Sequence, residues 1–91
     1  MRPDSTSITN ANAGELLLAG SAAIARGDLA FDLSAVTEVD SAAVALLLEW
    51  QRQAIARGER LQLAGVPADI ASLARLYGVD SLLDLGRAEG P

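Results

Sequence analysis

The pair Asp40-Ser41 stands directly before the apolar segment 42–48 and is the part of the chain best suited to chemistry. At the start of a helix, four backbone N–H groups lack partners within the helix, and the aligned peptide dipoles leave about half a positive charge there. Either side chain can accept a hydrogen bond from these N–H groups, so Asp40 and Ser41 are both candidates for the helix cap. A phosphate on Ser41 would also be favoured at this position. We therefore expect function to be located at this turn.

The residue types that the chain lacks exclude most catalytic chemistry. It contains no Cys and no His, and all seven basic residues are Arg. These absences remove thiol nucleophiles, histidine bases, Schiff-base and P-loop lysines, and zinc sites built from His or Cys. A pair of catalytic carboxylates remains conceivable, but the acidic residues are scattered along the chain. We therefore expect a protein that has no catalytic residues, no cofactor and no metal.

The net charge and the length of the chain limit the remaining classes of protein to which it could belong. The net charge is −5 and the sequence pI is about 4.4, without a basic patch, so nucleic acid is not an expected partner. The 91 residues suit one domain, and a composition that is 51% hydrophobic but only 3% aromatic predicts an aliphatic, alanine-rich core. No apolar run approaches the roughly 18 residues of a membrane span, and the first residues lack a signal-peptide pattern. The sequence thus favours a cytoplasmic protein without direct membrane insertion.

Hydrophobic periodicity, interrupted by Gly and Pro, predicts alternating strands and helices. The expected strands are Ser5–Thr9, Leu29–Leu33, one that starts at Leu61–Leu63, and Val79–Leu85. The expected helices run from Asn12 to Arg26 before Gly27, from Ala42 to Arg57 before Gly58, and from Pro67 to Tyr77 before Gly78. Because such alternation forms βαβ units, we expect largely parallel pairing. Residues 1–4 and 86–91 are expected to be flexible ends.

The segment 42–57 has the clearest helical pattern. Its buried side is expected to carry five residues at helical spacing, which are Val44, Leu47, Leu48, Gln51 and Ile55. Trp50 falls on the flank of this stripe, beside Ala43 and Leu46. Two interpretations of Trp50 are open at this point. It either packs half-buried against the core or anchors an interface, a role in which Trp is enriched.

Three segments, taken together with the order of elements, resemble one family. They are residues 39–48 (VDSAAVALLL), 65–67 (GVP) and 73–79 (LARLYGV). They resemble the STAS domain, and within it most closely the small STAS subunits of Mla-type phospholipid ABC transporters. The resemblance implies an α/β fold in which helices pack against a mixed sheet. The residues before Asn12 suffice for one strand where a STAS domain normally has two, so we expect an open sheet edge. Either a partner protein would cover this edge, or a second copy of the chain would cover it in a homodimer.

The resemblance also implies a function. Subunits of this kind are non-catalytic and bind, stabilise or regulate the cytoplasmic ATPase of the transporter, so the complex would hold this chain at the periphery of the inner membrane. The residues that we expect in the partner-binding surface are Asp40, Ser41, Ala42, Ala43, Leu46, Trp50 and Tyr77.

A second function is implied by another branch of the family, the anti-sigma factor antagonists, in which Ser41 would be a phosphorylation switch. Adding about two negative charges would break an interface built around a neutral hydroxyl. Such antagonists usually carry Gly two residues after the phosphorylated Ser, whereas this chain has Ala43. The extra methyl group is expected to keep a kinase backbone at a greater distance. Both alternatives place Ser41 in contact with another protein.

Overall fold

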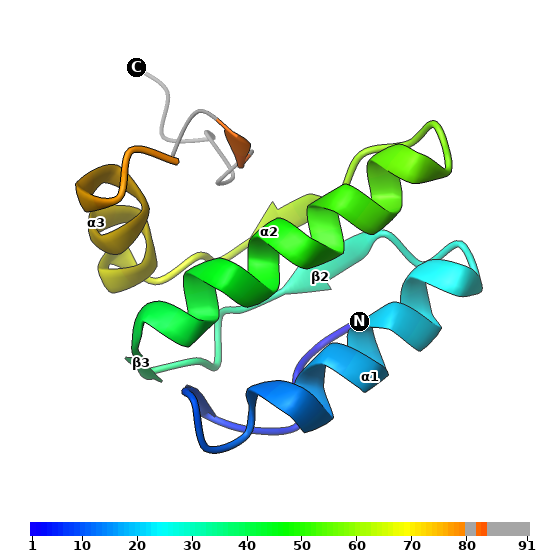
Figure 1. The fold of residues 1–91 in the computed structure, drawn as a ribbon. Helices are drawn as coiled ribbons and strands as arrows, with labels where there is room; N and C mark the ends of the chain where they lie inside the picture. Colours follow the sequence, from blue (N-terminus) through cyan, green and yellow to red (C-terminus); the bar gives the residue numbers. More distant parts are fainter. Residues whose placement is uncertain (80–81, 84–91) are drawn as a thin grey trace.

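The computed structural model describes residues 1–79 and 82–83 and shows an α/β arrangement (Figure 1). In chain order the elements are β1 (Ser7–Ile8), α1 (Ala13–Ala25), β2 (Ala30–Asp32), β3 (Glu38–Val39), α2 (Ser41–Ala56), β4 (Gln62–Ala64) and α3 (Ala68–Leu76). The predicted alternation of strands and helices is confirmed except at β2 and β3, which follow each other without a helix between them, and β3 was not predicted. Of the predicted strand Val79–Leu85, residues 80–81 and 84–85 lie outside the described residues, and Val79, Leu82 and Leu83 are not in a strand.

The three described helices end in the same way, at the glycines that the sequence indicated. Gly27 and Gly58 have φ values of 84° and 75°, a left-handed conformation that glycine adopts without steric cost. After α1, Gly27 N–H donates to Ile24 O and Asp28 N–H donates to Ala23 O. This pair of bonds closes the last turn of the helix, and the same pattern recurs after α2 and α3. Each glycine therefore sets where its helix stops.

The strands form two small sheets rather than one. β1 pairs with β3 and β2 pairs with β4, and both pairs are parallel. β2 and β3 are separated by a turn at residues 34–35, where Val36 N–H donates to Leu33 O. Residues 1–8 nevertheless run alongside residues 32–40, because Asp32 N–H donates to Met1 O and Thr37 N–H donates to Thr6 O. The described pairs agree with the expected parallel pairing.

The outer edge of β1 is closed by its own neighbours. Ser7 N–H donates to Ser5 Oγ at 3.1 Å, and Ser7 O accepts a hydrogen bond from Asn12 Nδ2 at 2.9 Å. Side chains therefore occupy the backbone groups that another strand would need. The edge of β1 is therefore not open as expected, and the homodimer through an open sheet edge stays a prediction.

The core lies between the helices and one face of the β2–β4 sheet. α1 and α2 run side by side in the same direction, and α3 lies on the opposite side of α2 from α1 (Figure 1). Phe31 and Leu63 are buried, while their neighbours Ala30, Gln62 and Ala64 are exposed. The helices therefore cover a single face of this sheet.

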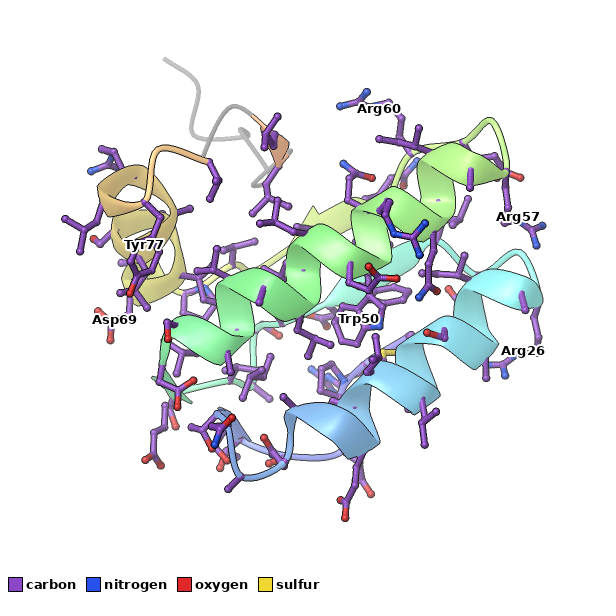
Figure 2. All side chains as sticks on the ribbon, in the orientation of Figure 1. Arg26, Trp50, Arg57, Arg60, Asp69 and Tyr77 are labelled. Carbon is purple, nitrogen blue, oxygen red and sulfur yellow. The ribbon has the colours of Figure 1, made fainter. Side chains whose placement is uncertain are left out.

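Trp50 is the centre of this core and not a residue of its flank. Its side chain is 0% exposed and lies between α1 and α2 (Figure 2). The indole packs edge-to-face on Phe31, with ring centroids 5.0 Å apart, and Nε1 donates to Leu17 O at 3.3 Å. Gly20 of α1 makes room for the ring, because any Cβ at that position would overlap the indole. The small residue on α1 thus fixes which side of α2 faces inward.

The predicted inner stripe of α2 is correspondingly rotated. Its buried residues are Ala43, Val44, Leu46, Leu47, Trp50, Gln51 and Ala54. Ile55, predicted to be inside, is 53% exposed, and Leu48 is partly exposed. The sequence pattern allowed either phase of the helix, and the large surface of the indole decides between them.

Candidate partner-binding surface

Asp40 caps α2. Its backbone is extended (φ −133°, ψ −168°), and its Oδ1 accepts a hydrogen bond from Ala42 N–H at 2.8 Å. Its Oδ2 accepts a second hydrogen bond, at 3.0 Å, from the backbone N–H of Asn10 in the loop before α1. One carboxylate thus satisfies a free N–H of α2 and ties the two helix starts together.

Ser41 is the first residue of α2, and its side chain is exposed. Because Asp40 is the cap, the alternative in which Ser41 caps the helix is wrong. The serine hydroxyl is therefore available at the surface. It stands at the N-terminal start of the 16-residue helix α2, where the helix dipole favours negative charge.

The structure separates the seven predicted contact residues into two groups. Ser41 and Tyr77 are exposed, and Asp40 and Ala42 are partly exposed. The other three predicted contacts are buried, and they are Ala43, Leu46 and Trp50. The prediction that these three residues lie in a contact surface is wrong, because they are on the side of α2 that faces the core. They support the surface from beneath and do not form part of it.

The end of α3 adds an exposed apolar residue that the sequence did not single out. Tyr77 is 52% exposed and Leu76 is 76% exposed, while Ile70 and Ala74 of the same helix are buried. Leu76 lies about 200° around the helix from Ala74, so the spacing of the buried residues could have placed it outside. α3 packs beside α2, and Figure 2 shows the side chain of Tyr77 in front of the ribbon of α3.

The outer side of α2 changes character along its length. Ser41 and Ala45, one turn apart, are exposed, small and neutral. Further along, Glu49 accepts hydrogen bonds from Arg52 Nε at 2.9 Å and from Gln53 at 3.1 Å. These bonds, with Arg52 contributing most, lower the pKa of Glu49 to about 2. The start of α2 can therefore approach another protein closely, whereas the next turns carry an ion pair.

Away from the start of α2, the exposed face of the β2–β4 sheet offers little for chemistry. A shallow hollow of about 270 Å³ lies on the β2–β4 sheet, and Asp32 is the only ionisable residue that lines it. Hydrogen bonds from the Ser34 hydroxyl and N–H, with Arg2 nearby, lower the pKa of Asp32, so its carboxylate is charged and engaged in the turn. Within residues 1–79 and 82–83, no group of His, Cys, Asp and Glu side chains could hold a metal ion. No helix in this part of the chain has the length and apolarity to cross a membrane.

Comparison with known proteins identifies a family. The family model described as "Mlab, STAS domain" matches residues 5–84, which is most of the chain. No curated protein matches. The match includes α2 with its cap, α3 and the exposed residues at their ends.

Proposed function

The chain belongs to the STAS-domain family described as Mlab, and from this premise we propose that it is a non-catalytic subunit that binds the ATPase of a Mla-type phospholipid ABC transporter. In such a complex the chain lies on the cytoplasmic side of the inner membrane. Ser41, Ala42, Leu76 and Tyr77 form the contact surface, which we call the α2–α3 surface. Asp40 supports it as the cap of α2.

The observation that carries this proposal is the exposed Ser41 hydroxyl at the start of the 16-residue helix α2. Asp40 satisfies the N–H of Ala42, so Ser41 has no capping task. The exposed side chains of Leu76 and Tyr77 supply apolar and aromatic area, which is what anchors protein interfaces. Small residues at positions 42 and 45 leave room for a partner to approach.

The mechanism that we propose is mass action. A subunit that binds only the folded, competent conformation of the ATPase raises its stability and shifts its population toward that conformation. No catalytic group is needed from this chain, which agrees with the absence of His, Cys and Lys.

The test is co-purification from the native bacterium with the tagged full chain and two variants. Ser41→Glu adds one negative charge inside the α2–α3 surface, where an acid at a helix start is tolerated, so the fold should be kept. Ala56→Glu adds the same charge at the exposed far end of α2, about 22 Å along the helix. We expect the original chain and Ala56→Glu to capture an ABC ATPase and Ser41→Glu to lose it, with unchanged thermal unfolding. Normal capture by Ser41→Glu would remove Ser41 from the interface.

A second candidate function is the anti-sigma factor antagonist, and one observation favours keeping it. The methyl group of Ala43 is fully buried, so it does not stand between a kinase and Ser41. The expected steric objection to this function is therefore wrong. Capture of a kinase-like anti-sigma factor, together with a phosphate on Ser41 by mass spectrometry, would replace the first proposal by the second.

A further inference from the structure

The exposed face of α1 has an unusually apolar composition. Its exposed residues are Gly14, Glu15, Leu18, Ala19, Ala22 and Ala25. Leu18 is 73% exposed, and Glu15 is the only charged residue within the helix. A helix that is apolar on both sides is normally covered on both sides, and the core covers only one side of α1.

The clearest contrast is with α3, whose exposed positions include the charged residues Asp69 and Arg75. α2 has Arg52 exposed and Glu49 partly exposed, and these two side chains form an ion pair. Charged residues on an outward face keep a helix in water, and α1 has one such residue along its 13 positions. The exposed face of α1 is therefore the kind of surface that interacts with another protein.

The two charged residues at the ends of this face have opposite sign and lie on the same side of α1. Glu15 is in the first turn of α1 and Arg26 is its C-cap, so they are 11 residues apart. Eleven residues are close to three helical turns, which places both side chains on the same side of the helix, about 17 Å from each other. Ala19 and Ala22 lie between them on the same side, and both are exposed.

We propose that a second copy of this chain covers this face, with the two α1 helices packed antiparallel about a two-fold axis. In that arrangement Glu15 of each copy faces Arg26 of the other, so two ion pairs form at the two ends. Ala19 and Ala22 of both copies meet near the axis, where their small side chains let the helices approach closely. Leu18 flanks the axis and is buried by the second copy. The charges on this face are thus self-complementary across a two-fold axis, which favours a second copy over an unrelated partner.

This inference goes beyond the proposed function and does not depend on it. α1 and α3 lie on opposite sides of α2, so pairing through α1 leaves Leu76 and Tyr77 accessible (Figure 1). It also differs from pairing through β1, whose edge is closed by Ser5 and Asn12.

The first experiment is sedimentation equilibrium of the full chain and of charge variants, at about 0.15 M salt to screen the net charge of −5. Glu15→Arg or Arg26→Glu alone places like charges opposite each other twice, and we expect each to weaken the dimer by about tenfold. An equimolar mixture of the two variants should restore association as a heterodimer, because opposite charges then face each other again. A chain that stays monomeric up to about 1 mM, or a mixture that does not recover, would overturn the proposal.

The second experiment uses the absence of native cysteines. Ala22→Cys places one thiol near the proposed axis, and Ala56→Cys places one on an exposed part of α2 as a matched control. We expect mild oxidation to cross-link the first variant much faster than the second, because a disulfide needs the two Cβ atoms about 4 Å apart. Equal rates would contradict the α1 pairing. Glu15→Arg should still capture the ATPase, so failure of this inference and failure of the proposed function are distinguishable.

Discussion

Asp40 and Ser41 are neighbours with different tasks. The carboxylate of Asp40 holds two backbone N–H groups, one at the start of α2 and one in the loop before α1. The hydroxyl of Ser41 is exposed one position later. Asp40 therefore stabilises the start of α2, and in the proposed function the adjacent Ser41 contacts the partner, so mutations can separate the two roles.

Asp40→Ala should destabilise the fold by about 1–2 kcal/mol, because it removes the cap of α2 and leaves Asn10 N–H without its partner. Ser41→Ala should change the free energy of unfolding by less than about 0.5 kcal/mol, as is usual for an exposed position. Urea unfolding of both variants measures the difference. A larger loss for Ser41→Ala than for Asp40→Ala would contradict the assignment of the cap.

Gly20 and Trp50 form the tightest contact of the core. Gly20→Ala should destabilise the protein by about 1–3 kcal/mol through overpacking, only partly offset by the better helix propensity of Ala. Gly14→Ala is the matched control on the same helix, because a Cβ there would meet nothing within 4 Å. We expect it to be neutral or slightly stabilising in thermal unfolding. Combining Gly20→Ala with Trp50→Leu should recover part of the loss, and simple additivity would contradict direct contact.

At the scale of the elements, α2 carries its own acid-sensitive stabilisation. The pKa of Glu49 is lowered from 4.5 to about 2, chiefly by its hydrogen bonds with Arg52. A lowered carboxyl pKa gives stability that is fully present above the unfolded value and is lost as the pH falls through the folded value. The relevant window is therefore between pH 4.5 and 2.

Glu49→Gln should lower the thermal midpoint at pH 7, and its difference from the original chain should shrink as the pH falls from 4.5 to 2. Arg52→Gln should show the same pH dependence, because the two side chains form one ion pair. Circular dichroism melts across this range provide the measurement. A difference that stays constant with pH would show that the pair does not contribute in this way.

The elements also show how far the sequence could be read. Helix ends were predictable because Gly27, Gly58 and Gly78 occupy positions with positive φ, which is a local requirement. The side of α2 that faces the core was not predictable, because it depends on the contact between Gly20 and Trp50, which are far apart in the chain. The break between β2 and β3 likewise arises from a turn that periodicity does not reveal.

At the scale of the whole molecule, the dependence on contacts between distant residues also explains which candidate surface residues were predicted wrongly. Asp40 and Ser41 could be placed at a helix start and Tyr77 at a helix end, because helix starts and ends have local signals in sequence. Ala43, Leu46 and Trp50 were misplaced because their orientation is a property of the packed core. Leu76 was not singled out, although its position about 200° around α3 from the buried Ala74 could have placed it outside. The two proposed surfaces, one at α2 and α3 and one on α1, therefore lie on a shared buried core.

The α2–α3 surface is the central claim, and hydrogen exchange of the full chain with and without the purified ABC ATPase tests it most directly. We predict slower exchange, on adding the ATPase, in peptides that contain the start of α2 and the end of α3. Exchange in the interior of α1 should be unchanged at a fixed concentration of the chain. Protection confined to α1, or no protection in either of the two predicted segments, would contradict the account.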